Sequence, residues 1–360
     1  MPNQKQDLYT LQCESYLYVE GNIIAQATAE NVAVTLGSNC VAFMFDEIRY
    51  ELDGVEIDSN KNVGITSMVK NYISLSSDKI ACIKNAAWDT INAHSTDGYF
   101  NFCIPLNLLL GFCEDYRRIV INARIELILI RSCSDNRLRG SSALEPKVKL
   151  FKIQWRMPHV LLNDINKLSL LRTLENGRYV SMSFRSWDLY EFLLLENTTK
   201  HLCPVKTATN LEKPRYVIFA LQTGRKNVMA ENITQFDNCN LINAKLYLNS
   251  ECYPYDDMNL DFAKRKYAIL YKMYKRFRTS YYGCSSDDVW LTTDDFLRRG
   301  PFVVIDCSRQ NESIKSATVD VRIEFECKEN IPVNTTAYCL ILHDRVVEYR
   351  PLTNIVSKLY

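Results

Sequence analysis

The segment Val319-Asp320-Val321-Arg322-Ile323-Glu324-Phe325-Glu326-Cys327 alternates apolar and charged residues. Successive side chains of a β-strand point to opposite faces, so this segment predicts a strand with one buried and one solvated face. The stretch Ile119–Ile130 repeats the alternation with isoleucine and leucine. Further strand-like runs are spread along the chain: Val41–Leu52, Val148–Trp155, Arg215–Leu221, Leu241–Leu248, Pro301–Ile305 and Ala337–His343.

Helical patterns are few, and the predicted strands are joined mainly by non-helical connections. This favours an all-β sandwich or jelly-roll class over alternating strand–helix units. A capped helix is predicted over Asn163–Glu175, with Ile165, Leu168, Leu171 and Leu174 at helical spacing and Gly177 as a stop. Two further helices are expected over Ala263–Tyr274 and Ile65–Tyr72.

The first of these helices divides the chain into two β-rich halves of similar length. The expected organisation is a first domain over residues 1–162, a linker helix over 163–177 and a second domain over 178–360. The length of 360 residues suits two domains.

Composition excludes several classes of protein. Apolar residues make up 47% and charged residues 24%, so the chain is globular rather than disordered. A formal net charge of +1 argues against a nucleic-acid coat of uniformly basic character. The polar stretch Met1–Asp7 precedes no signal peptide, and no apolar run of about 20 residues predicts a membrane span.

The chain has 13 cysteines and no CxxC pair, which gives a zinc ribbon no support. Many cysteines lie in apolar runs, where a free thiol behaves as a small hydrophobic group. We therefore expect reduced cysteines and a reducing compartment, cytosol or nucleus. The sequons at Asn197, Asn232, Asn311 and Asn334 are then chance matches.

Catalytic and metal-binding motifs find little support. Glycine-rich phosphate loops and a GxSxG elbow are absent from the sequence. Ser76–Lys79 satisfies SxxK without its companion motifs, and the dyad His343-Asp344 lies in a strand pattern, where a structural role is expected. The interpretation is a protein with no catalytic, cofactor or metal site. The groups considered were His94, His159, His201, His343, Asp256-Asp257, Asp287-Asp288 and Asp294-Asp295.

One basic cluster stands out, with tyrosines interleaved. The favoured interpretation is the solvated face of an amphipathic helix whose other face is apolar, and contact with nucleic acid is the alternative. The cluster comprises Lys264, Arg265, Lys266, Lys272, Lys275, Arg276 and Arg278.

An ordered series of segments resembles the double jelly-roll major capsid proteins of large DNA viruses and Polinton-like elements. Phe102–Phe112, running into Ile119–Ile130, resembles the family's "IPL…F…LPL" passage in the first roll. Lys213–Gln222 resembles its "PVKELFWVLQ" strand in the second roll. Leu246–Asn249 resembles "L-x-L-N-G", although Ser250 stands where the family has glycine.

Four other segments occupy corresponding places in the family order. They are the closing strand Leu150–Trp155, the inter-domain helix Asn163–Glu175, the opening strand Arg178–Tyr190, and Cys307–Ser313 leading into Val319–Glu326. The resemblance covers roughly residues 15–350.

The resemblance implies two tandem antiparallel jelly rolls of eight strands each, joined by a short helix. It also implies a non-enzymatic homotrimer of pseudo-six-fold shape that tiles an icosahedral capsid in the virion, with minor capsid or penton proteins as partners and assembly in the host cytoplasm or nucleus. Two other hypotheses stay open. One is a host or domesticated β-sandwich binding protein, and the other is a sandwich-fold hydrolase, for which the sequence offers no convergent groups.

Overall fold

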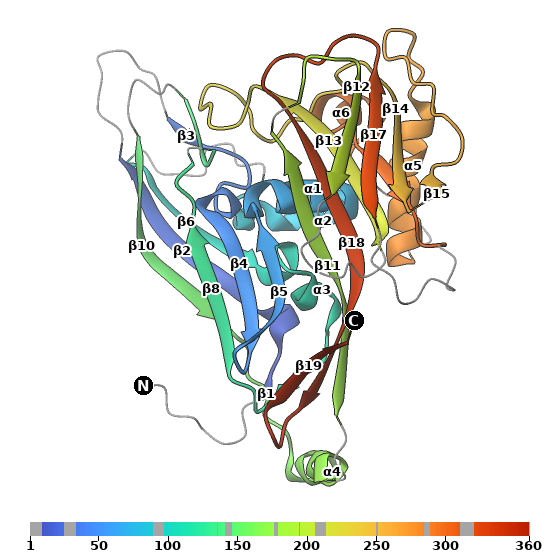
Figure 1. The fold of residues 1–360 in the computed structure, drawn as a ribbon. Coiled ribbons are helices and arrows are strands. Elements are labelled where there is room, and N and C mark those ends of the chain that lie inside the picture. The colour runs from blue at the N-terminus through green and yellow to red at the C-terminus, as the bar shows by residue number, and fades with distance from the viewer. Residues whose placement is uncertain are drawn as a thin grey trace.

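The computed structural model shows two β-sandwiches standing side by side, with helices at their junction and one helix below them (Figure 1). The described residues are 9–24, 34–88, 97–134, 136–140, 146–175, 179–193, 195–205, 214–249, 251–283, 289–309 and 320–359.

The second sandwich is a complete eight-stranded jelly roll. One sheet has the order β11-β18-β13-β16, with β19 added to β18, and the other has the order β12-β17-β14-β15. All these pairs are antiparallel. The strands are β11 (Val180–Phe192), β12 (Lys200–Val205), β13 (Pro214–Thr223), β14 (Leu241–Leu248), β15 (Glu251–Tyr253), β16 (Val303–Asp306), β17 (Val321–Cys327), β18 (Thr335–Arg350) and β19 (Ile355–Leu359).

The first sandwich repeats six of these eight strands. Its sheets have the orders β10-β2-β6 and β5-β4-β8, which match β18-β13-β16 and β15-β14-β17 of the second roll. Among the described residues, the first roll has no counterpart of β11 or β12, so each of its two sheets has three strands. The roll therefore has six described strands, where eight were expected. The strands are β2 (Tyr16–Ile24), β4 (Phe45–Leu52), β5 (Val55–Lys61), β6 (Tyr99–Pro105), β8 (Ile125–Arg131) and β10 (Lys147–Arg156).

Two short ladders accompany the first roll. β1 (Tyr9–Thr10) pairs with β7 (Val120–Ile121), and β3 (Thr35–Leu36) pairs with β9 (Leu138–Arg139). The single strand expected over Ile119–Ile130 is therefore wrong. It divides into β7 and β8 because Asn122 adopts a left-handed backbone with φ of 51°.

Helices are inserted at the same place in both rolls. α1 (Val63–Ser74) and α2 (Ser77–Cys82) connect β5 to β6, while α5 (Ala268–Tyr282) and α6 (Thr293–Arg299) connect the matching strands β15 and β16. Every residue of α1 is buried. The remaining short helices are α3 (Gly111–Asp115) and the 3₁₀ turns Gln12–Glu14, Ala42–Met44, Ile83–Ala86 and Leu106–Leu108.

The helix expected over Ala263–Tyr274 begins and ends later than predicted. Residues 261–266 form a turn closed by backbone pairing of Asp261 with Lys266, and the Asp261 carboxylate accepts a hydrogen bond from the Lys264 amide at 3.0 Å. Arg265 has a φ of 57°, which no helix accepts. α5 starts at Ala268 and stops before Gly283, whose φ of 63° suits a helix end.

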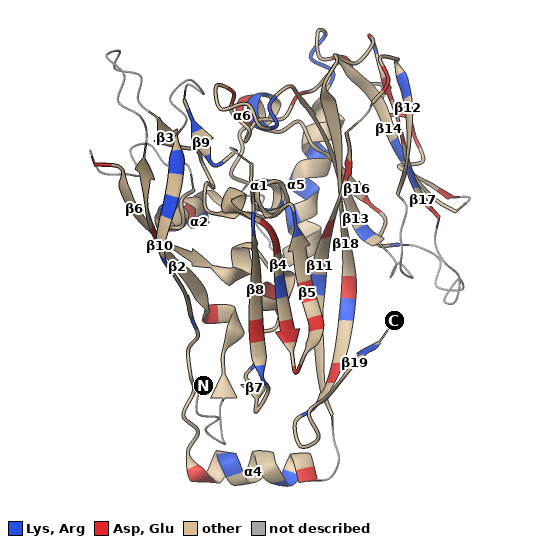
Figure 2. Cartoon of the chain, turned by 60° about the vertical axis from the view of Figure 1, so that its left-hand side comes forward, with Lys and Arg blue, Asp and Glu red and all other residues tan. Residues whose placement is uncertain are grey.

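α4 (Asp164–Glu175) matches the predicted linker helix, and Figure 2 shows it lying across the base beneath both rolls. The Asn163 side chain caps it by accepting a hydrogen bond from the Asn166 amide at 2.9 Å. The predicted apolar stripe is not a packing face within this chain: Ile165 is 78% exposed, Leu168 is 56% exposed, and only Leu174 is buried. Gly177 lies outside the described residues.

The two apolar cores exchange segments across α4. Phe43 and the buried face of α1, which precede α4, belong to the core of the second roll. Met182 and Tyr349, which follow α4, belong to the core of the first roll. Since each core takes residues from both sides of the linker, the two rolls pack as one body.

Candidate interaction surfaces

A partly buried ion pair joins the two rolls at their junction. Arg185 of β11 donates from Nε to Asp115 Oδ2 at 2.8 Å and from Nη2 to Asp115 Oδ1 at 2.5 Å. Its guanidinium also lies 3.7 Å from the ring centroid of Tyr281. Such a two-point pair fixes direction as well as distance, so it sets how α3 of the first roll meets β11 and α5 of the second.

A second ion pair, with a buried lysine, lies beside the first. Lys70 of α1, 1% exposed, contacts Glu114 Oε2 at 2.9 Å and donates to the Asn107 carbonyl at 2.8 Å. The Tyr282 hydroxyl donates to Glu114 Oε1 at 2.7 Å. Burial raises the pKa of Tyr282, and the negative charge of Glu114 raises this pKa further. The phenol therefore stays protonated and holds the carboxylate in place.

His343 has a structural role. It is 3% exposed, and its Nε2 lies 2.7 Å from Ser186 Oγ and 3.1 Å from Asp188 Oδ2. Burial lowers the pKa of His343 to about 4, although Asp188 opposes this shift. Its sequence neighbour Asp344 is exposed and pairs with Arg215 at 2.8 Å. The two side chains thus diverge and form no dyad.

The other histidines and the cysteines do not converge on a site either. His159 forms a backbone bridge with Thr10, and the His201 ring stacks on Phe325. His94 and Cys284 lie outside the described residues. Within the described ranges, no three His, Cys, Asp or Glu groups are placed to hold a metal ion, and the twelve described cysteines are free.

The adjacent carboxylates serve local structure. Asp257 pairs with Lys245 at 2.7 Å, while Asp294 and Asp295 occupy the first turn of α6. Ser76, part of the SxxK match, is the N-cap of α2. Asp287-Asp288 lies outside the described residues.

The basic cluster does not form one helical surface, contrary to the prediction. Lys264, Arg265 and Lys266 are exposed on the turn that precedes α5. Arg278 is 7% exposed and points into the protein, which leaves three basic side chains on the outside of the helix. These three are Lys272, Lys275 and Arg276. The opposite face of α5 is apolar as expected.

A cavity of about 400 Å³ opens between α5, β16 and the loop after β15. Met273, Phe277 and Ile305 form part of its apolar lining, and Asp256 and Arg276 also line it. Tyr255 and Ile269 also line it, and they are 85% and 54% exposed. Large apolar side chains around a hollow are typical of protein contact surfaces.

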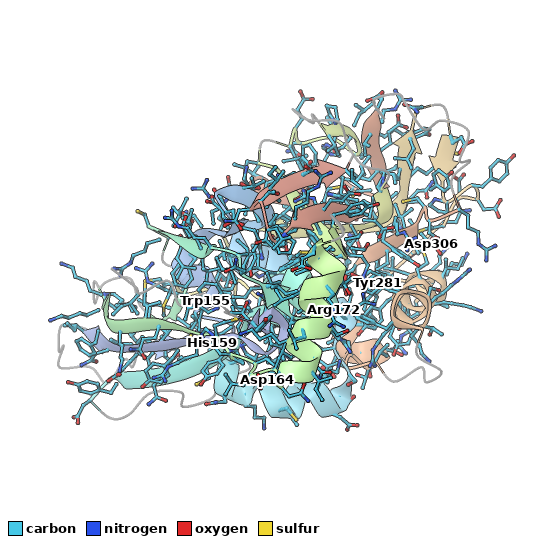
Figure 3. All side chains as sticks on the ribbon, turned by 90° about the horizontal axis from the view of Figure 1, so that it is seen from below. Trp155, His159, Asp164, Arg172, Tyr281 and Asp306 are labelled. Carbon is cyan, nitrogen blue, oxygen red and sulfur yellow. The ribbon has the colours of Figure 1, made fainter. Side chains whose placement is uncertain are left out.

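Seen from below, α4 crosses between the first roll, marked by Trp155 and His159, and the second, marked by Tyr281 and Asp306 (Figure 3). No helix in the described part of the chain is both long and apolar enough to span a membrane.

The connectivity of the second roll, its partial repeat in the first and the buried junction define a double jelly-roll protein. A sequence model described as the double jelly roll-like domain matches residues 34–347, and the chain belongs to this family. A comparison with curated proteins finds no match.

The chain is similar to solved structures of viral proteins. The chain is similar to VP54 of PBCV-1, fitted into a reconstruction of the virophage Sputnik, with 10% identity, a TM-score of 0.58, and coverage of 100% of this chain and 91% of that one. It is also similar to the Faustovirus major capsid protein, with 8% identity, a TM-score of 0.55, and coverage of 96% and 86%. At this identity the likeness concerns the fold, which confirms the double jelly-roll class predicted from the segment order.

Proposed function

We propose that this chain is a major capsid protein of a DNA virus or a related mobile element, with a structural and non-enzymatic role. The observation that carries the proposal is the pair of jelly rolls locked side by side by Arg185–Asp115 and Lys70–Glu114. Two rolls held in a fixed relation give one subunit two similar lateral units. The likeness to the Faustovirus major capsid protein and to a model of the PBCV-1 virus capsid supports the same role.

The proposed assembly unit is a homotrimer whose six rolls form a pseudo-hexameric tile of an icosahedral shell. A head-to-tail contact that closes after three copies gives such a ring. The near-neutral net charge of +1 suits dense packing of identical subunits. We place part of the contact at the cavity beside α5, because Tyr255 and Ile269 expose apolar surface there.

The proposed domain division follows the linker helix: residues 1–162, 163–177 and 178–360. The further proposal is location in the virion, after assembly in the host cytoplasm or nucleus. Minor capsid or penton proteins are the proposed partners. Contact of the genome with Lys264, Arg265 and Lys266 is part of the same hypothesis, because these side chains are exposed.

Size-exclusion chromatography with light scattering, followed by negative-stain microscopy, tests the assembly. The purified chain should form trimers at micromolar concentration, and the images should show six-lobed particles. Tyr255→Arg combined with Ile269→Arg should shift the protein to monomers. The matched control is Val333→Arg, at a residue that is 72% exposed and distant in sequence, and it should leave the trimer intact. A stable monomer of the unmodified chain would instead favour a host or domesticated β-sandwich binding protein.

A further inference from the structure

In the part of the chain that the structure describes, the first roll is open along one side. In the second roll, β18 is paired on both sides by β11 and β13, and β17 is paired on both sides by β12 and β14. Their counterparts in the first roll are β10 and β8. Within the described residues, β10 pairs only with β2, and β8 pairs only with β4. Beyond the end of β10, His159 forms a backbone bridge with Thr10 of β1. The positions that β11 and β12 fill in one roll are therefore without a described strand in the other.

The open side leaves core-facing residues of β8 partly exposed. Leu127 and Leu129 lie opposite Tyr50 and Ile48, which are both fully buried, so they point into the sandwich. Nevertheless Leu127 and Leu129 are only half-buried. At the matching places in β17, Ile323 is 0% exposed and Phe325 is 3% exposed. The difference follows from the missing neighbour.

The same contrast separates β10 from β18. Every residue from Thr335 to His343 of β18 is buried. In β10, Ile153 lies opposite the buried Val19 and yet is 42% exposed, and Phe151 at the bulge is 46% exposed. Figure 1 shows β10 at the margin of the first roll.

The two free edges face each other. Arg131, at the end of β8, donates from Nη2 to the backbone carbonyl of Val148 in β10 at 3.0 Å. This contact ties the edges at one end of the roll. Beyond it, no strand among the described residues pairs with the outer edge of β10, and an unpaired edge is the general requirement for β-strand addition.

Charge indicates what such a strand would carry. The outer face of β10 is basic, and two of its lysines lie over aromatic rings, Lys149 at 5.6 Å from Phe151 and Lys152 at 5.8 Å from Tyr18. In the second roll, the covering strand β12 complements its neighbour through Lys200–Glu326 at 3.4 Å. By the same cross-strand rule, a strand beside β10 needs acidic residues on its outer positions. The basic residues of β10 are Lys147, Lys149, Lys152 and Arg156.

We propose that the open side of the first roll binds an extended polypeptide segment of a partner, apolar at alternate positions and acidic at the others. Its apolar residues would cover Leu127, Leu129 and Ile153, and its carboxylates would face the lysines of β10. A second copy of β10 is disfavoured as the occupant, because its lysines would meet these lysines and because the bulge between Leu150 and Lys152 interrupts a flat edge. The inference does not depend on the capsid role.

A labelled synthetic peptide tests it on the full-length protein. The probe alternates valine and glutamate over about nine residues, which spans roughly 30 Å of strand. Fluorescence anisotropy should show saturable binding, and hydrogen exchange should slow across residues 147–156. A peptide alternating valine and lysine, and one of the same composition as the probe without the alternation, should bind at least about tenfold more weakly.

Charge reversal supplies the decisive variant. Lys149→Glu with Lys152→Glu should weaken binding of the acidic probe at least about tenfold and should create binding of the lysine probe. The matched control, Lys264→Glu with Lys266→Glu, changes the same charge on the exposed turn before α5 and should change neither.

Three outcomes would overturn the proposal: no binding of the acidic probe, equal binding of all three peptides, or strong exchange protection, before peptide is added, of those amides in residues 147–156 that do not bond to β2. The last outcome would mean that the edge is already covered, by this chain or by a second copy. None of these outcomes bears on trimer formation, which light scattering measures separately.

Discussion

Gly111 lies against the backbone of Arg185 at the junction between the rolls. A Cβ atom at Gly111 would stand 1.8 Å from the Arg185 carbonyl oxygen, closer than any side chain allows. Gly111 opens α3, and Arg185 reaches back to Asp115 at the end of the same short helix. The missing side chain lets α3 approach β11 closely enough for the ion pair to form.

We expect Gly111→Ala to reduce the free energy of unfolding by about 3 kcal/mol or more, since backbone must move to accept the methyl group. Urea denaturation followed by tryptophan fluorescence measures this. The matched control is Gly37→Ala, where the nearest atom to an added Cβ is 3.6 Å away, an ordinary contact. Equal effects of the two substitutions would contradict the close-approach argument.

The buried pair Lys70–Glu114 makes a second prediction. Lys70→Met should cost roughly 3–5 kcal/mol of stability, because it leaves the Glu114 carboxylate buried without its cation. Combining it with Glu114→Gln should recover part of this loss. The exposed pair Arg124–Glu126 is the control, and Arg124→Met should change stability by less than about 1 kcal/mol. A double-mutant cycle with no coupling would contradict the prediction.

The pH dependence of stability should reflect two opposed groups. The pKa of His343 falls to about 4 on folding, so its contribution is present above the ordinary pKa and is lost as pH drops toward 4. Burial raises the pKa of Asp58 to about 6, although Arg345 opposes this, so Asp58 favours the folded state increasingly as pH drops from 6. Between pH 4 and 6 the two effects nearly cancel.

Replacing one of the two groups should therefore reveal the pH dependence of stability that the other contributes. Asp58→Asn should make stability fall with acidification by up to roughly 1.4 kcal/mol per pH unit, and His343→Gln should make it rise by a similar slope. Urea titrations between pH 4 and 6 measure both slopes. If either variant kept the same slope as the unmodified chain, the assignment of these two groups would be wrong.

The exposed stripe of α4 should contribute little to stability of the single chain. Ile165→Ser and Leu168→Ser should each change the free energy of unfolding by less than about 0.5 kcal/mol. Leu174→Ala, at the buried end of the same helix, should cost about 2–3 kcal/mol. A large loss from the first two substitutions would mean that α4 packs on the chain by its apolar stripe.

The cysteines should all be reduced. Thiol counting under denaturing, non-reducing conditions should find close to all 13 free. Five or six bridges would contradict the prediction of a reducing compartment.

The sequence predicted strands best where each strand has one buried and one solvent-exposed face. Leu241–Leu248 coincides with β14, and the alternation of β17 locates it to within two residues. The alternation pattern did not predict β5, because its inward positions include polar residues. Asp58 is 1% exposed and accepts a hydrogen bond from the Phe112 amide, and Asn60 is 2% exposed and donates one to the Leu109 carbonyl. The sequence pattern therefore predicts no strand after Leu52, although the structure has β5 there.

The junction could not be found from the sequence, because its partners are far apart along the chain. Lys70, Glu114 and Arg185 carry no common motif, and only the packing of α1, α3 and β11 brings them together. Arg278 shows that a charge pattern in the sequence does not establish which side chains are exposed. It belongs to a basic run, yet the rotation of α5 turns it inward while Lys272 and Arg276 stay exposed.

The helices inserted between β5 and β6 and between β15 and β16 bear on the ancestry of the chain. Two independent insertions at the same connection are a less economical history than one insertion followed by duplication of the gene. The economical history has an ancestor that encoded one roll with its helices already in place. Its product would have built with six identical copies the ring that the two-roll descendant is proposed to build with three. Fusion would then free each half to diverge, as the unequal numbers of described strands in the two rolls illustrate.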